Sequence, residues 1–132
     1  MKYTTSFIVF PKHCNHHKDL IFGGAFMAEL DLVAAHCVRK VLVGNLYGIE
    51  NAVTHKAEFE FKKPAYVGDF LNFQAEVTTV GKKSISIRVQ VTRKFDEIIA
   101  IANFVFITVG EIKNLEHHPT YLPYKEHGLD KV

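Results

Sequence analysis

Tryptophan is absent from this chain, and cysteine, methionine and proline are scarce, with two, two and four residues among 132. The two cysteines, Cys14 and Cys37, are too few for a disulfide framework, so we expect a reducing, cytoplasmic setting. No apolar run approaches the roughly 20 residues that cross a bilayer, and we expect no membrane partner. The formal net charge is only +2, which does not indicate a nucleic-acid binder.

Phenylalanine, by contrast, is abundant, and eleven such residues indicate a bulky core lined by a sheet. The length of the chain suits one domain with one core. We expect that domain to span 1–110 and a polar tail to follow over 111–132.

Five segments carry strand signals. They are 5–10, 53–61, 71–77, 84–91 and 98–109. The middle three alternate apolar and polar side chains, which is typical of strands with one face in water. In the first of these, Val53 and His55 are expected to face the core and Thr54 to face water. The last segment is apolar nearly throughout, which predicts a central strand.

A helix is predicted over 23–40, and it is apolar over most of its circumference, as a buried helix is. We expect one face to fill the core with Phe22, Phe26, Leu30, Val33 and Cys37. A second face should let the sheet approach closely because its residues are mostly small: Gly24, Ala28, Asp31 and Ala35. The order of strand, helix and four strands predicts an α+β fold. One curved antiparallel sheet of three meander hairpins would wrap a long central helix.

Asp31 lies about two turns into this helix. A carboxylate within a buried helix is costly unless it is paired or functional, so Asp31 is a candidate catalytic group. It could act as a general base toward water or as a nucleophile, or it could be a paired structural residue, and the sequence leaves these open. Glu29 points to a different face, which indicates a solvated or interface role.

Gly23 and Gly24 open the helix, where backbone N–H groups are unpaired and the helix dipole favours negative charge. Without side chains, they would let a carbonyl oxygen approach those groups as in an oxyanion hole. The alternative is that the two glycines only permit tight packing. The histidines and cysteine between His13 and His17 fit no standard zinc spacing, so we predict no metal site.

Several short motifs follow one another in a fixed order across 5–109. They are Pro11, Asn15-His16, Phe22-Gly23-Gly24, Met27, Asp31, Lys63-Pro64, Val67-Gly68-Asp69 and Gly81 with Ser84-Ile85-Ser86-Ile87. This ordered set resembles the hotdog-fold acyl-CoA thioesterases, especially the YciA-like and cytosolic acyl-CoA hydrolase branch. The resemblance implies a hotdog fold and hydrolysis of acyl-CoA to free acid and CoA. It implies no cofactor apart from the coenzyme A of the substrate.

The resemblance also implies roles for individual residues. The catalytic group would comprise Asp31, Asn15 and Gly24. The substrate-binding group would comprise Gly23, Lys63, Lys82, Lys83, Ser84 and Arg88, with the basic residues holding the CoA phosphates. An ungapped match places His16 rather than Asn15 in the loop position. In the family the Asn and the Asp of one site come from different hotdog units. The resemblance therefore implies at least a homodimer, and we expect a tetramer or hexamer.

A non-catalytic acyl-CoA-binding hotdog protein is the alternative function, since it would keep the groove and lose the chemistry. Retention of Asp31 favours the enzyme. A hotdog dehydratase is disfavoured because Phe10-Pro11-Lys12-His13 does not reproduce the His-containing motif of those enzymes. The preferred acyl chain stays open at this stage.

Overall fold

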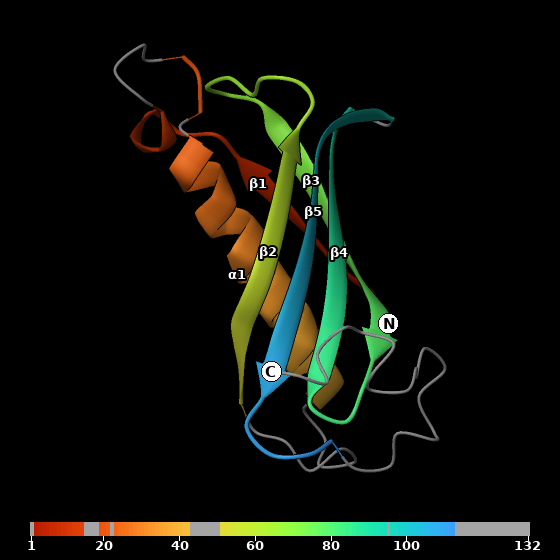
Figure 1. Ribbon diagram of the computed structural model, residues 1–132. Helices are drawn as coiled ribbons and strands as arrows, with labels where there is room; N and C mark the ends of the chain where they lie inside the picture. Colours follow the sequence, from red (N-terminus) through yellow and green to blue (C-terminus); the bar gives the residue numbers. More distant parts are fainter. Residues whose placement is uncertain (1, 15–18, 22, 43–50, 95, 113–132) are drawn as a thin grey trace.

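One long helix lies across a five-stranded antiparallel sheet, as the ribbon of the computed structural model shows (Figure 1). The structure describes residues 2–14, 19–21, 23–42, 51–94 and 96–112. Most of the predicted tail, 113–132, lies outside these ranges. Within the ranges that the structure describes, no helix combines the length and the hydropathy of a membrane-spanning segment.

The elements follow the predicted order closely. They are β1 (Lys2–Ile8), the short 3-10 helix η1 (Pro11–His13), α1 (Gly23–Leu42), β2 (Ala52–Phe61), β3 (Phe70–Val80), β4 (Ser84–Arg93) and β5 (Glu97–Thr108). The first strand begins and ends earlier than predicted, because its pairing with β3 runs from Lys2 opposite Glu76 to Ile8 opposite Phe70, where β3 begins.

The strands lie in the order β1-β3-β4-β5-β2, and every neighbouring pair is antiparallel. The prediction of three successive hairpins is therefore wrong in one respect. β3, β4 and β5 form a meander, but β2 pairs with β5 and lies at the opposite side of the sheet from β1. The apolar β5 is an interior strand, as its composition predicted.

The core lies between α1 and the face of the sheet that α1 covers. Phe26, Leu30, Val33 and Cys37 of the helix are buried there, as predicted, while Phe22 lies outside the described residues. The largest sheet residues that they meet are Phe73 and Phe104, each about 1% exposed. The helix contacts all five strands, so this single contact surface holds the two layers together.

The small-residue face of α1 does not pack closely on the sheet, contrary to our expectation. Gly24 and Ala28 are exposed, and Asp31 and Ala35 are half-buried. A sheet that curves around a helix covers only part of its circumference, and this flank remains open beside the edge strand β2. The helix is thus buried on one side only within a single chain.

A β-bulge in β2 changes which side chains face the helix. The pairing with β5 shifts between Thr54 and Lys56, so that His55 is the extra residue. Thr54 consequently lies opposite the buried Phe106, while Val53 is 57% exposed. The expectation that Val53 and His55 face the core is wrong, because an inserted residue reverses the alternation on one side of the bulge.

Candidate active site

Asp31 is held by a side chain from the neighbouring edge strand. The Thr54 hydroxyl donates a hydrogen bond of 2.8 Å to Asp31 Oδ1, which joins β2 to the third turn of α1. Both residues stay accessible, since Asp31 is half-buried and Thr54 is exposed. A carboxylate that is oriented by a hydroxyl and open on one side can still accept a proton from water or attack a carbonyl.

Thr54 was missed by the sequence analysis. Strict alternation placed it on the wet face of the strand, and only the bulge turns it toward the helix. Bulges are frequent beside active sites because they re-aim side chains. No residue pattern in 52–61 predicts a bulge at this position.

The helix start carries the candidate oxyanion hole. Gly23 and Gly24 are both exposed, and a Cβ added at Gly23 would meet nothing within 4 Å, so a ligand atom has free access there. Seven residues separate Gly24 from Asp31, which at 1.5 Å per residue is roughly 10 Å along the helix axis. One chain therefore does not bring the two groups into contact with the same atom.

A hollow of about 290 Å³ opens next to the helix start. Its wall is mainly apolar and includes Leu20, Ile21, Phe26, Phe61, Pro64 and Ala65. Gly23, Lys62 and Lys63 also line it. The hollow thus joins one predicted substrate-binding lysine, Lys63, to the predicted oxyanion hole.

The loop from β2 to β3 forms part of that wall, and backbone hydrogen bonds fasten it to the chain before α1. The N–H of Ile21 donates to the Ala65 carbonyl at 2.9 Å, and the N–H of Val67 donates to the Asp19 carbonyl at 2.8 Å. Gly68 has a φ of +88°, a left-handed conformation that glycine adopts without strain. The loop therefore fixes the position of the segment that leads into the helix start.

Arg93 fastens the same loop to the sheet. Its guanidinium donates to Asp69 Oδ2 at 2.7 Å, to the Pro64 carbonyl at 3.0 Å and to Glu97 Oε1 at 2.8 Å. Lys63 donates to the other oxygen of Glu97 at 3.2 Å. The hydrogen bond from Arg93, with that from Lys63, lowers the pKa of Glu97 to about 2. The same carboxylates raise the pKa of Arg93 further above its usual range.

The β3–β4 hairpin lies at the other end of the sheet. Lys82 and Lys83 form its turn, and their carbonyls accept hydrogen bonds from Ile112 and Thr108 at the end of β5 and beyond. Ser84 is buried, and its hydroxyl has no hydrogen-bond partner among the residues that the structure describes. Within one chain the β3–β4 hairpin that carries these three predicted substrate-binding residues lies at the opposite end of the sheet from the start of α1 (Figure 1).

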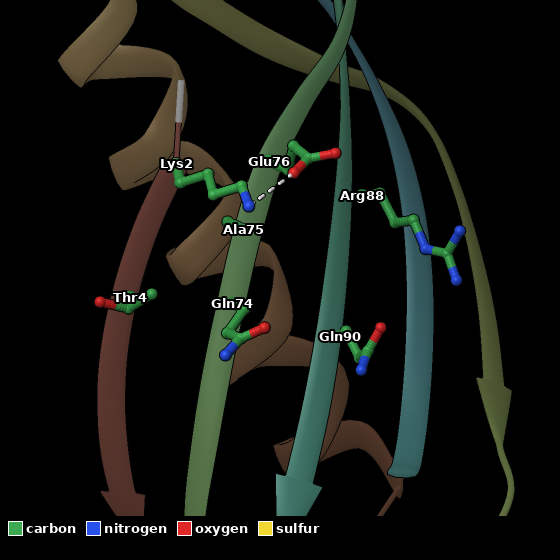
Figure 2. A pocket seen from close by; sticks show the side chains of 7 residues that line it. All are labelled: Lys2, Thr4, Gln74, Ala75, Glu76, Arg88 and Gln90. Atoms are coloured by element: carbon green, nitrogen blue, oxygen red, sulfur yellow. Dashed lines mark ion pairs between the residues drawn. The ribbon is translucent and has the colours of Figure 1, made fainter. Parts of the chain in front are cut away.

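Arg88 lies on the face of the sheet that α1 does not cover. Figure 2 shows it on β4 beside Glu76 of β3, with the helix behind the strands. The residues around it line a shallow hollow of about 310 Å³ that includes Lys2, Gln74 and Gln90. A single chain therefore brings together Gly23, Gly24 and Lys63, but not Arg88.

Other predicted residues are placed as follows. Asn15 and His16 lie outside the described residues. Glu29 is half-buried on the opposite flank of α1, in a small hollow near β1 that His36 and Tyr3 also line. There the Tyr3 hydroxyl and His36 Nδ1 are hydrogen-bonded at 3.2 Å. Within the described ranges, no three His, Cys, Asp or Glu side chains are grouped so that they could hold a metal ion.

Comparison with known proteins assigns this chain to a family. The family model of the thioesterase superfamily matches residues 19–100. An uncharacterised acyl-CoA thioester hydrolase of Buchnera aphidicola is 33% identical over 106 residues, covering 76% of this chain and 74% of that protein. The acetyl-coenzyme A thioesterase of Rattus norvegicus is 32% identical over 84 residues. That match covers 64% of this chain but only 14% of the rat protein.

Among solved structures, an acyl-CoA hydrolase of Staphylococcus aureus in complex with butyryl-CoA and CoA is similar, with a TM-score of 0.72 and 27% identity. The match covers 92% of this chain and 71% of the S. aureus chain. Structures of the same hydrolase include variants with one aspartate, one asparagine or one threonine replaced by alanine. These matches confirm the hotdog fold and the resemblance on which the sequence-based assignment depended.

Proposed function

Because this chain belongs to the thioesterase superfamily, we propose that it hydrolyses acyl-CoA thioesters to a free acid and CoA. The observation that carries the proposal is the Asp31 carboxylate held by Thr54 on an open flank of the helix. The names of the Buchnera and rat relatives, and the CoA esters bound to the S. aureus hydrolase, support this substrate class. The three residue types replaced in the S. aureus variants are those of Asp31, Asn15 and Thr54.

In the proposed reaction, the helix start stabilises the oxyanion and the Asp31 carboxylate activates water. The thioester carbonyl oxygen accepts hydrogen bonds from backbone N–H groups at Gly23 and Gly24, which stabilise the negative charge that develops on it. Asp31 then accepts a proton from water as the water oxygen attacks the carbonyl carbon. The C–S bond breaks, and the CoA thiolate leaves and takes up the proton that Asp31 accepted, which returns Asp31 to its ionised form. Alternatively the Asp31 carboxylate attacks first and gives an anhydride that water hydrolyses.

The proposed site is assembled from two copies of the chain. Asp31 and Gly24 are roughly 10 Å apart along one helix, whereas both must reach the same thioester. A second copy placed along β2 and the open flank of α1 would bring the partner subunit's Gly24 toward Asp31. We therefore propose a homodimer at least, within a tetramer or hexamer, acting in the cytoplasm. Asn15 would come from the same chain as that Gly24.

Lys63 and Gly23 at the helix start would bind coenzyme A. Lys82, Lys83, Ser84 and Arg88 would contribute from another copy, since one chain holds them away from that end of the sheet. The ammonium and guanidinium groups would bind the phosphates of the CoA moiety.

A screen of acyl-CoA esters with free CoA as the measured product tests the proposal. We expect release of CoA that depends on protein and saturates with substrate. The alternative function, acyl-CoA binding without chemistry, would give saturable binding by calorimetry and no CoA release. Light scattering at micromolar concentration tests the assembly, and a monodisperse monomer would contradict it.

A further inference from the structure

The hollow at the helix start supports an inference about the acyl group that the family assignment does not give. We propose that it receives the acyl chain, that it suits medium chains of about six to ten carbons, and that Phe61 limits their length. The inference rests on the proposed function, since it names the acyl group of the same substrate. It differs from the acetyl and butyryl groups named for the rat and S. aureus relatives.

The volume argues for a medium chain. An apolar cavity of about 150 Å³ is known to hold benzene, which corresponds to about 25 Å³ for each carbon. At that density the hollow of about 290 Å³ would hold about twelve carbons. Its mouth is open, so part of the volume belongs to solvent and to the thioester itself. Six to ten carbons remain for the chain.

The wall has the apolar character that an acyl chain requires, and two lysines contribute to it. Phe26 is 2% exposed and Phe61 is 41% exposed, so the hollow passes from a dry interior to a wet mouth. Lys62 and Lys63 line it and pair with Glu60 at 3.1 Å and Glu97 at 3.2 Å. Because exposed lysine pairs are weak, the ammonium groups can exchange their carboxylates for phosphates. An apolar chain with its thioester at the open mouth fits this arrangement, and the pantetheine arm would carry the phosphates out of the hollow.

Phe61 is the wall residue that can best set the chain length. Its ring lies 5.2 Å from that of Phe26 and stacks on Phe59 at 6.1 Å. It lies at the end of the edge strand β2 and is partly exposed, so its truncation costs less packing than truncation of Phe26. Replacing Phe61 by Ala enlarges the hollow, and replacing it by Trp narrows it.

The experiment measures kcat/KM for CoA esters of two to sixteen carbons. Each further methylene that becomes buried should raise kcat/KM roughly fourfold until the hollow is full. We expect a maximum near eight carbons, on the order of a hundredfold above butyryl-CoA. Phe61→Ala should move the maximum to longer chains and Phe61→Trp to shorter ones. Phe70→Ala is the matched control, since Phe70 is 53% exposed and does not line this hollow.

Calorimetry with non-hydrolysable thioether analogues of the same chain lengths separates this inference from the proposed function. Affinity that rises to about eight carbons without any hydrolysis would support the acyl pocket and contradict the enzyme. Hydrolysis that is fastest with acetyl- or butyryl-CoA, with no gain in affinity for longer chains, would overturn the inference and leave the enzyme intact. A maximum that Phe70→Ala moves as far as Phe61→Ala does would overturn the role of Phe61.

Discussion

The Thr54 hydroxyl of β2 donates a 2.8 Å hydrogen bond to the Asp31 carboxylate of α1. The two residues are 23 positions apart in the chain, and only the bulge at His55 brings them face to face. A carboxylate held in this way keeps one oxygen oriented while its other oxygen stays available. Thr54 is therefore a positioning residue for the proposed reaction.

Replacing Thr54 by Val removes the donor and keeps the shape of the side chain. A hydrogen bond to a charged group contributes about 1.5–3 kcal/mol, so we expect kcat to fall roughly ten- to a hundredfold with little change in KM. Thr54→Ser restores the hydroxyl and should restore most of kcat, which a purely structural role would not require. Thr4→Val on the exposed face of β1 is the control. Equal rates for the Val and Ser variants would contradict the assignment.

Asp31→Asn keeps the volume of the side chain and removes the base or nucleophile. General acid–base catalysis typically contributes about a hundred- to ten-thousandfold, so CoA release should fall by that factor. The oligomer and the affinity for an acyl-CoA thioether should survive. Glu29→Gln, on the other flank of the helix, should leave the rate unchanged. If Asp31→Asn dissociates the oligomer instead, the carboxylate has a structural role.

The sequence predicts the helix and all five strands. The helix and the segments 53–61, 71–77 and 84–91 have a clear period, and the last strand is apolar nearly throughout. Phe26, Leu30, Val33 and Cys37 recur at helical spacing, and all four are buried. The same pattern does not say how far the sheet wraps around the helix. Gly24 and Ala28 are apolar yet exposed, because small apolar residues suit either a tight contact or an uncovered flank.

Strand pairing and the bulge could not be read from local periodicity. β2 pairs with β5, which is 36 or more positions further along the chain, and no local signal selects that partner over β3. The bulge inserts one residue at His55, and period-two counting then assigns Thr54 to the wrong face. The predicted catalytic aspartate was thus identified without the hydroxyl that holds it.

Asn15 and His16 compete for one position in the loop before the helix, and activity can decide between them. We expect Asn15→Ala to lower kcat by about a hundredfold if its amide orients water or the carbonyl in the site. His16→Ala should then have a small effect. Thermal unfolding of each variant checks that the fold is retained. A large loss with His16→Ala alone would shift the alignment of this loop by one residue.

The Glu97 carboxylate should contribute to stability in a pH-dependent way. Its pKa is lowered from 4.5 to about 2 by Arg93 and Lys63, so the folded state favours the ionised form. That contribution is present above about pH 4.5 and is lost as the pH falls toward 2. Glu97→Gln should be less stable than the wild type at pH 7, and the difference should shrink at pH 3. Urea unfolding at both pH values measures this difference in the free energy of unfolding. Glu58→Gln, in an exposed ion pair, is the control.

The basic residues at the two ends of the sheet give a test of where coenzyme A is bound. Lys62 and Lys63 lie at the helix start, whereas Lys82 and Lys83 lie at the far hairpin. In a site built from two copies, both groups reach one CoA molecule. The Lys62→Ala/Lys63→Ala variant and the Lys82→Ala/Lys83→Ala/Arg88→Ala variant should then each raise KM roughly tenfold, with a smaller effect on kcat.

The salt dependence of KM checks the electrostatic origin of that effect. Phosphate contacts of exposed cations weaken as ionic strength rises, so the wild-type KM should increase between low and physiological salt. Each variant should show a flatter dependence, because it has lost part of the screened attraction. If only Lys62→Ala/Lys63→Ala changes KM, the CoA moiety lies along a single chain and the hairpin lysines are solvated. If neither variant changes KM, the phosphates are bound by other groups.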